Sequence, residues 1–376
     1  MIYLDHAAAT PVDPRVFKAM EPYFLHDFFN PSAAYLPAKK VAADYEAAKA
    51  VIAHAIGAKV SDLVITAGAT EANNLAFANI SSSLYLITEH DSVRKVAEKH
   101  GGVPIVVDKN GRIDMADLKS KITDVTELIS VSLVNNELGT IQPLAEIASL
   151  IREIRFDRLS RGIKTPLYLH SDASQALNLL DINVARLGVD LLTLNAAKIY
   201  GPKGVGALYV SHDVKLTPVT YGGGQENGLR SGTENVPGVI GFAKAVELTK
   251  EHLNGNRKKY ANLRKLLLSE LQGCELINKK HALDNFVVLC YNNIDAERLI
   301  YLLEDKQVYV STGAACAASK GKKSHVLAAI GLSDEQIAGS LRLSLGETND
   351  ESQIRAAAKI INEVVENERK RLEKYE

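Results

Sequence analysis

Residues 166–210 read PLYLHSDASQALNLLDINVARLGVDLLTLNAAKIYGPKGVGALYV, and this stretch decides the fold class. It holds three short apolar runs, at 166–170, 191–194 and 205–210, with a helical pattern between the first two. Leucine and β-branched residues with little alternation are typical of strands that are buried on both faces. Similar runs at 63–66, 84–88, 104–107 and 128–134, mostly separated by helical patterns, predict an open α/β sheet of seven mostly parallel strands.

The chain of 376 residues is long enough for two domains, and the pattern of apolar and charged residues changes after about Gly241. A helical stretch rich in Lys, Glu and Leu at 242–271 is followed by a strand-like run at 285–291 and a helix near 296–304. A final helix opens at Thr348-Asn349-Asp350-Glu351, which fits a capping box. We therefore predict a second, smaller α+β domain, whereas the pattern of the first ten residues assigns them to neither domain.

The composition excludes several classes of protein. With 46% hydrophobic and 24% charged residues, the chain resembles neither a disordered protein nor a disulfide scaffold. A net charge of -1 gives no electrostatic footprint for nucleic acid or an anionic membrane, so we expect neither as a direct partner. We also expect neither a signal peptide nor a membrane span.

Cysteine and histidine usage limits the chemistry further. The three cysteines, Cys274, Cys290 and Cys316, form an odd and sparse set, which favours a reducing compartment, and we expect a cytoplasmic protein. The ten histidines show no spacing typical of metal ligands, so we predict no metal site.

The residues that follow the apolar runs are the candidates for function, because ligands bind at the carboxyl ends of strands in open α/β sheets. Lys198 follows the run at 191–194, where a partly desolvated amine can form a Schiff base. Asp172 follows the run at 166–170, one helix and one strand earlier. Pyridoxal phosphate needs such a lysine and a carboxylate against its pyridinium nitrogen. Alternatively, Lys198 is a solvated surface lysine and Asp172 caps a helix that starts near Ser174.

A second set of polar residues follows other strands. Residues 66–71 carry a strand into a small-residue turn and a helix, where free backbone N–H groups and the Thr70 hydroxyl could bind an anion. His90 could stack on an aromatic cofactor and move protons, or could simply cap a helix. Gln175 and Asn136 could bond a phenolate oxygen of the cofactor, or could be satisfied loop amides.

Two residues of the C-terminal part carry possible chemistry. Cys316 lies in a small, polar and basic segment at 311–324, where nearby cations favour a nucleophilic thiolate. Cys290 lies in an apolar run and is expected to be an inert core thiol, and Cys274 gives no signal. Arg342 lies on an alternating, strand-like segment and needs a carboxylate partner, which is either a substrate or a structural Asp or Glu.

Over nearly its whole length the chain resembles the cysteine desulfurases, in the class V aminotransferase group of fold-type I pyridoxal phosphate enzymes. The segment around Cys316 has the extended form of the NifS/IscS-like group rather than the short form of the SufS-like group. The motifs that carry the resemblance are Tyr3–Pro11, Gly68-Ala69-Thr70-Glu71, Val134–Gly139, Asp172-Ala173-Ser174-Gln175, Lys198–Gly204, Arg230-Ser231-Gly232-Thr233, Ala315-Cys316 and Arg342.

The resemblance implies a large domain over residues 11–245, and a small α+β domain formed by residues 1–10 and 246–376 that carries the cysteine segment. It also implies pyridoxal 5'-phosphate as cofactor. Lys198 would hold the cofactor as a Schiff base and later carry a proton, Asp172 would pair with the pyridinium nitrogen, and His90 would stack on the ring. The other implied cofactor contacts come from the backbone of Ala69 and the side chains of Thr70, Asn136, Gln175 and Asn195, and from Thr233.

Thr233 would reach the phosphate of the neighbouring subunit, which implies a homodimer. Asn136 and Arg342 would bind the carboxylate of L-cysteine. Cys316 would take the sulfur as a persulfide and release alanine.

The chain departs from this family at one place. The family usually carries Ser-x-His before the lysine, with both side chains on the phosphate, whereas this chain has Asn195-Ala196-Ala197. Ala197 has no donor and Asn195 offers only an amide. We therefore expect weaker retention of the phosphate and easier loss of the cofactor.

The sequence thus predicts an L-cysteine desulfurase that passes sulfur to an acceptor protein, for iron–sulfur clusters or for tRNA thiolation. One alternative is a selenocysteine lyase or a related pyridoxal phosphate lyase of the same fold. Another is a degenerate, non-catalytic paralogue that keeps the fold as a scaffold.

Overall fold

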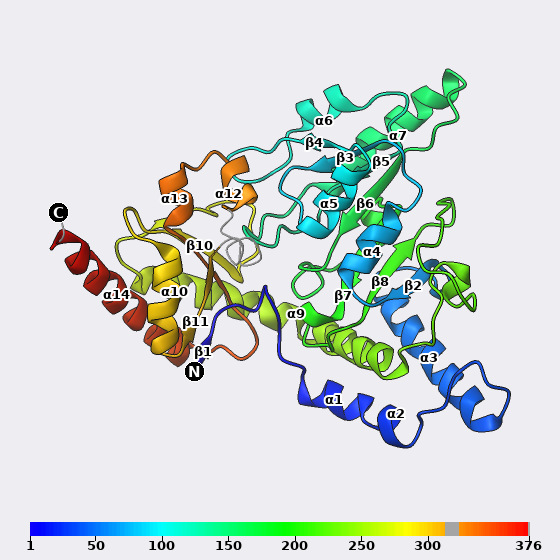
Figure 1. The fold of residues 1–376 in the computed structure, drawn as a ribbon, viewed down its shortest axis with the longest axis horizontal. Helices are drawn as coiled ribbons and strands as arrows, with labels where there is room; N and C mark the ends of the chain where they lie inside the picture. The colour runs from blue at the N-terminus through cyan, green and yellow to red at the C-terminus, as the bar shows by residue number, and fades with distance from the viewer. Residues whose placement is uncertain (313–322, 375–376) are drawn as a thin grey trace.

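The computed structural model describes residues 1–312 and 323–374. Its larger sheet has seven strands in the order β2-β8-β7-β6-β5-β3-β4 (Figure 1). Six of them run in the same direction, and β8 is antiparallel to both of its neighbours. The predicted mostly parallel sheet is therefore confirmed. The strands are β2 Leu63–Thr66, β3 Ser83–Leu86, β4 Val103–Ile105, β5 Leu128–Ser130, β6 Tyr168–Asp172, β7 Leu191–Asn195 and β8 Gly206–Val210.

Helices cover both faces of this sheet. α4 (Ala69–Ala76) and α5 (Asp91–Lys99) pack on one face, where they meet Val64 and Leu191. α3 (Leu36–Ala55), α7 (Leu144–Ser160) and α9 (Val236–Glu270) supply the core on the other face, which holds the alternate strand residues such as Ile65 and Leu192. Both sides of each central strand are therefore buried, which explains why the strands read as continuous apolar runs.

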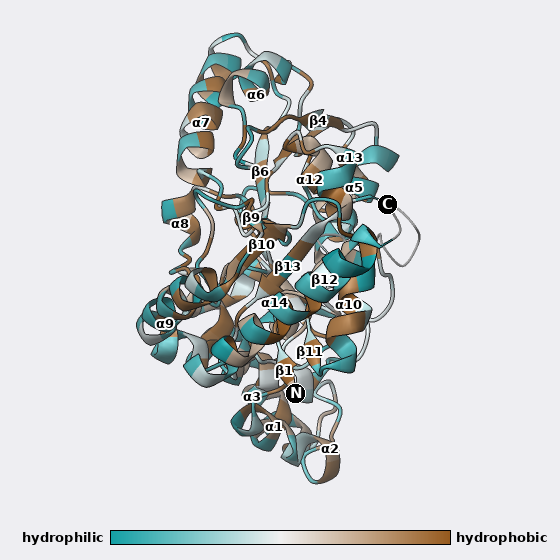
Figure 2. Ribbon diagram, turned by 90° about the vertical axis from the view of Figure 1, so that its left-hand side faces the viewer, coloured by the Kyte–Doolittle hydropathy of each residue, from teal (hydrophilic) through white to brown (hydrophobic). Residues whose placement is uncertain are grey.

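The C-terminal part forms a second, antiparallel sheet in the order β12-β13-β10-β9. α10 (Ala296–Asp305) and α14 (Glu351–Glu373) contact each other beside it, and α14 also contacts α9 (Figure 2). The small α+β part is thus as predicted in type. Its strands are β9 Glu275–Leu276, β10 Phe286–Cys290, β12 Ser311–Thr312 and β13 Ser340–Ser344.

The N-terminal arm joins this C-terminal part through a two-stranded parallel sheet, in which β1 (Ile2–Tyr3) pairs with β11 (Val308–Tyr309). The predicted domain boundary between residues 245 and 246 falls inside the single helix α9. The shorter elements are α1 Pro14–Met20, α2 Pro22–Leu25, α6 Met115–Lys121, α8 Val184–Leu187, α12 His325–Ala329, α13 Asp334–Ala338 and the 3-10 turns η1 Val60–Asp62, η2 Ala196–Lys198 and η3 Glu226–Gly228.

The predicted capping box at the start of α14 is wrong in one detail. Asp350, not Thr348, is the N-cap, and its carboxylate accepts a hydrogen bond from the backbone N–H of Gln353 at 2.8 Å. Aspartate is at least as good an N-cap as threonine, and Asp350 is the residue that directly precedes the first turn of α14. Across the described residues, no helix has both the length and the apolar character that crossing a membrane requires.

A buried ion pair ties the loop after β8 to the large sheet. The Glu226 carboxylate accepts hydrogen bonds from Lys49 Nζ at 2.9 Å, from the Tyr45 hydroxyl and from the Ile65 backbone N–H at 2.8 Å. Lys49 and Tyr45 lie one turn apart on α3, so both reach the same carboxylate.

We predict that Lys49→Met destabilises the protein by about 3–5 kcal/mol, because it leaves the Glu226 charge buried without its cation. The double variant Lys49→Met/Glu226→Gln should recover most of this loss, since it removes both charges. Urea unfolding followed by circular dichroism measures the effect, with Lys279→Met, which breaks an exposed pair with Glu275, as the control. Equal midpoints for the Lys49 and Lys279 variants would contradict the prediction.

Candidate active site

A cavity of about 1040 Å³ lies at the carboxyl ends of the parallel strands. The segments that follow β2, β3, β5, β6 and β7 all contribute to its wall, as the strand-end rule predicts. The N-terminal arm adds Ala7 and Ala8, and the C-terminal part adds Lys323, His325 and Arg342. The site therefore lies between the two sheets and needs both parts of the chain.

Lys198 and Asp172 line this same cavity, as the pyridoxal phosphate interpretation requires. β7 ends in the 3-10 turn η2, which Asn195 caps by accepting a hydrogen bond from the Ala197 N–H at 3.1 Å, and Lys198 is its last residue. Lys198 Nζ donates to the carbonyl of Ala7 at 2.8 Å and to that of Ala8.

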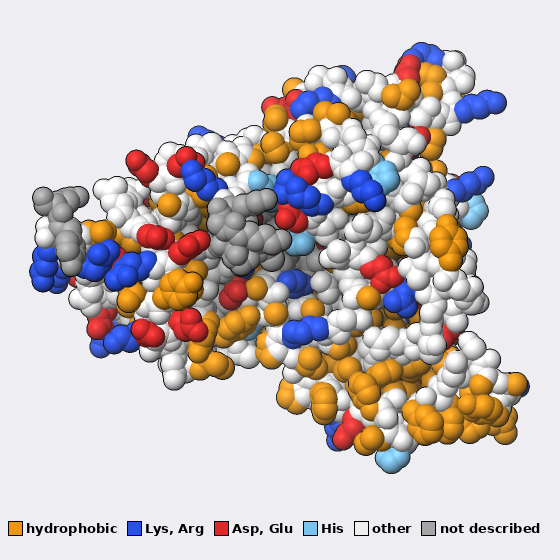
Figure 3. Space-filling model, in the orientation of Figure 1, with side chains coloured by type: hydrophobic (Ala, Val, Ile, Leu, Met, Phe, Trp, Pro, Cys, Tyr) orange, Lys and Arg blue, Asp and Glu red, His pale blue; other side chains and the backbone are white. Residues whose placement is uncertain are grey.

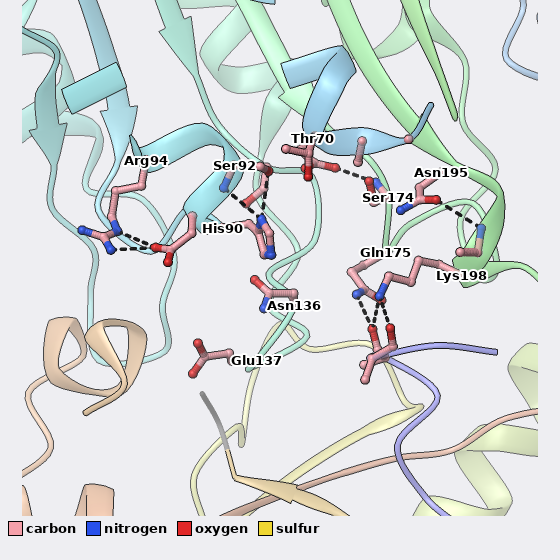
Figure 4. Close-up of a pocket in the computed structure, with 18 of the residues that line it drawn as sticks. Thr70, His90, Ser92, Arg94, Asn136, Glu137, Ser174, Gln175, Asn195 and Lys198 are labelled. Carbon is pink, nitrogen blue, oxygen red and sulfur yellow. Dashed lines mark hydrogen bonds and ion pairs between the residues drawn. The ribbon is translucent and has the colours of Figure 1, made fainter. Parts of the chain in front are cut away.

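Gln175 shares this backbone partner with the lysine. Its Nε2 donates to the Ala7 carbonyl at 2.9 Å, so both side chains reach the same point of the N-terminal arm (Figure 4). The arm thus holds the lysine amine at the cavity wall, and the alternative of a solvated surface lysine does not describe it.

Asp172 ends β6 and is only 7% exposed. Its Oδ1 accepts from the Ser174 N–H at 2.9 Å, and its Oδ2 accepts from Asn73 Nδ2 at 2.8 Å. No helix begins at Ser174, because turns follow β6, so the helix-cap alternative for Asp172 is wrong. The carboxylate is a buried, hydrogen-bonded acceptor at the floor of the cavity.

A second carboxyl group, Glu89, lies close to Asp172, and the sequence analysis gave it no role. It is fully buried, and its Oε1 accepts from the Ser132 N–H at 2.5 Å. Burial, together with the charge of Asp172, raises the pKa of Glu89 well above its usual range. Its place in the short segment between β3 and α5 is the one signal that could have indicated a functional role.

His90 caps a helix, as one of its two interpretations expects, and its place in the cavity wall is compatible with the other. It is the N-cap of α5, since Nδ1 accepts from the Ser92 N–H at 3.1 Å, and it also lines the cavity. The ring is therefore fixed at one edge by the start of the helix, while its other edge is left toward the cavity (Figure 4).

The N-terminus of α4 forms one end of the cavity. Gly68 precedes this helix at φ 147°, a conformation that favours glycine, and an added Cβ would meet no atom there within 4 Å. Ala69 and Thr70 line the cavity, and Figure 4 shows Thr70, Ser174 and Asn195 together at this end. Within the described residues, the first backbone N–H groups of α4 have no carbonyl partner, so the end offers donors to an anion.

Arg342 lies at the opposite side and is 4% exposed. Its Nη2 donates to Asp5 Oδ1 at 2.6 Å, and its Nη1 donates to the Asn136 carbonyl at 2.8 Å. Of the two partners that the sequence left open, the structure shows the structural carboxylate, Asp5. Asn136 itself lines the cavity beside the arginine.

Glu137 is a further acid that the sequence analysis did not assign. Its carboxylate lines the cavity and accepts from the Ser324 hydroxyl at 2.5 Å. Burial raises the pKa of Glu137 to about 7, although the Ser324 hydroxyl and the Arg342 charge act in the opposite direction.

Among the described residues, one predicted site residue does not line the cavity of its own chain. Thr233 is exposed and does not line it. Cys316 lies outside the described residues. Burial raises the pKa of the other two thiols, Cys290 and Cys274, which disfavours their thiolate forms.

Comparisons with known proteins agree with this geometry. The chain matches the aminotransferase class-V family over residues 2–356. It is 36% identical to "Cysteine desulfurase IscS" of Clostridium botulinum, over 98% of this chain and 95% of that protein. It is 37% identical to the protein of the same name from Methanosarcina thermophila, over 97% of this chain and 92% of that protein.

Solved structures give the same result. A NifS-like protein from Rickettsia africae superposes with a TM-score of 0.88 at 30% identity, over 97% of this chain and 99% of that chain. With the family matched along nearly the whole length and the same fold around the cavity, the chain belongs to the aminotransferase class-V family, among relatives that are named cysteine desulfurases.

Proposed function

We propose that the protein is a cysteine desulfurase that uses pyridoxal 5'-phosphate to remove sulfur from L-cysteine, giving L-alanine and a persulfide on Cys316. The observation that carries this proposal is the shared cavity, in which the Lys198 amine, the Asp172 carboxylate and the free N-terminus of α4 face one space. The names of the relatives support the substrate. So does the structure titled "SspA in complex with cysteine", which superposes with a TM-score of 0.80 at 31% identity.

The cavity has polar atoms to match each part of this cofactor. The hydroxyls of Ser174 and Ser132 are buried without a partner among the described residues, and both residues line the cavity. The N–H groups of α4 and the hydroxyls of Thr70 and Ser174 would hold the phosphate, with the Asn195 amide beside them. Asp172 would accept the N–H of the ring.

When bound, the cofactor supplies an electron sink for the carbanion of the substrate. Lys198 would bind it covalently and later deliver a proton to the carbon that loses sulfur. His90 would lie against the face of the ring, and Gln175 would contact its phenolate oxygen. The Ala7 carbonyl orients both Gln175 and Lys198 for these tasks.

Asn136 and Arg342 would bind the carboxylate of the substrate. Because Asp5 already holds Nη2 of Arg342, the substrate must share this guanidinium with it or displace it. The Cys316 thiolate would attack the sulfur, forming an S–S bond. As the C–S bond breaks, its electron pair stays on carbon, which takes the proton from Lys198.

The persulfide sulfur would then pass to an acceptor protein, for iron–sulfur clusters or for tRNA thiolation. The acceptor is a protein in our proposal, with neither nucleic acid nor a membrane as a direct partner, and the sparse cysteines favour the cytoplasm as the place of work.

A homodimer would complete the site. Thr233 is exposed and away from the cavity of its own chain, which suits a residue that serves the phosphate of a partner. A large apolar patch covers α1, α2 and the start of α3 (lower right in Figure 3), and such patches are typical of interfaces. Its exposed members are Phe17, Phe24, Leu25, Phe28, Tyr35 and Leu36.

The first test is mass spectrometry after incubation with L-cysteine. We expect added sulfur on Cys316 and an equal amount of alanine in the supernatant. Cys316→Ser should lose both, while Cys274→Ser, which removes a partly buried thiol far along the chain, should keep both. Activity on selenocysteine that survives Cys316→Ser would instead identify a selenocysteine lyase. Protein that stays colourless with added cofactor would identify a scaffold.

The second test concerns the phosphate. We expect Ala197→His to slow the loss of cofactor on dialysis, because an imidazole adds a donor where the methyl group has none. The visible absorbance that remains on the protein measures retention, with Ala196→Ser, at a buried neighbour, as the control. Equal retention in wild type and Ala197→His would defeat the expectation.

The third test is subunit complementation. Thr233→Ala and Lys198→Ala should each be weakly active or inactive alone. A mixed dimer should regain one complete site, because the Thr233→Ala chain keeps its lysine and receives Thr233 from its partner. Absence of any recovery in a mixture that analytical ultracentrifugation shows to be dimeric would contradict the shared site.

A further inference from the structure

Two side chains without a part in the reaction above, Asn73 and Ser92, connect Asp172 to His90. Asn73 lies in α4 and is 0% exposed. Its Nδ2 is 2.8 Å from Oδ2 of Asp172 and 2.8 Å from Oγ of Ser92. Oγ of Ser92 in turn is 2.8 Å from Nδ1 of His90 (Figure 4). The four side chains form one unbroken series of hydrogen bonds.

The donors and acceptors of this series can be assigned from the Asp172 end. An ionised carboxylate only accepts, so Asn73 must turn its Nδ2, and not its Oδ1, toward Asp172. The second proton on Nδ2 then points to Oγ of Ser92. Since that oxygen accepts from Asn73, the Ser92 hydroxyl keeps its own proton for Nδ1 of His90.

An independent contact gives the same assignment. The backbone N–H of Ser92 lies 3.1 Å from Nδ1 of His90, and a backbone N–H can only donate. Nδ1 therefore carries a lone pair, and the proton of the neutral ring is on Nε2. Nε2 lies on the ring edge opposite Ser92, on the cavity side, and forms no hydrogen bond with a described residue.

We propose that Asn73 and Ser92 are positioning residues that hold His90 in the tautomer protonated at Nε2 and couple its orientation to that of Asp172. This inference rests on the proposed function, in which Asp172 and His90 serve one ring. The proton that His90 can donate then always faces the cavity. Asp172, at the edge of the cofactor ring, and His90, against its face, are thus oriented by the same series of hydrogen bonds.

The tautomer can be read directly in the holoenzyme labelled with 15N-histidine, with His90→Gln to identify the signals. In wild type we expect the shift of a protonated nitrogen at Nε2 and of an unprotonated one at Nδ1. Ser92→Ala should raise the population protonated at Nδ1 by about twofold to tenfold, the range for one lost hydrogen bond. Ser92→Thr keeps the hydroxyl and should restore the wild-type shifts.

Kinetics provide the second measurement. Ser92→Ala and Asn73→Leu should lower kcat for cysteine by about threefold to tenfold with little change in KM, and Ser92→Thr should recover it. The control is Asn79→Ala, whose Nδ2 bonds the Lys215 carbonyl away from the cavity. If Asn73→Leu fails to fold, the comparison of Ser92→Ala with Ser92→Thr still tests the proposal.

A wild-type ring protonated at Nδ1, or ring shifts that Ser92→Ala leaves unchanged, would overturn the inference. The proposed function fails separately: an enzyme that yields no alanine but shows the Nε2 tautomer would refute the desulfurase activity and keep the assignment of Asn73 and Ser92.

Discussion

Parallel pairing of the central strands is the constraint on which the whole site depends. Because β3, β5, β6 and β7 run in one direction, their carboxyl ends meet at one edge, and the polar residues that follow them converge there. The strands themselves are buried on both faces and have no room for chemistry. The side chains that can react therefore lie at the last residues of the strands and in the segments that follow them, and these form much of the wall of the cavity.

The buried ionisable groups at this edge of the sheet each have defined hydrogen-bond or ion-pair partners. Asp172 receives donors on both oxygens, whereas Glu89 receives one bond on Oε1 and has its pKa raised. Two neighbouring carboxyl groups with unequal hydrogen bonding thus lie close together at this edge. Arg342 is likewise neutralised by Asp5.

The sequence predicted what local pattern controls. Apolar runs gave the strands, and the rule of strand ends gave Lys198, Asp172, His90 and Thr70, all of which line the cavity. It could not give contacts between residues far apart in the chain. The pairing of Asp5 with Arg342 spans 337 residues, and Lys49 with Glu226 spans 177.

Asn73 was missed for a related reason: on α4 it reads as an ordinary helix residue, and only the tertiary fold brings Asp172 and Ser92 to its amide.

α9 sets a mechanical limit on the molecule. Its 35 residues form one rod of roughly 50 Å that contacts α3 beside the large sheet and α14 beside the small one. Bending such a rod would break its internal hydrogen bonds, so the two halves are braced against a wide swing. Admission of substrate is then left to short segments and side chains at the rim of the cavity.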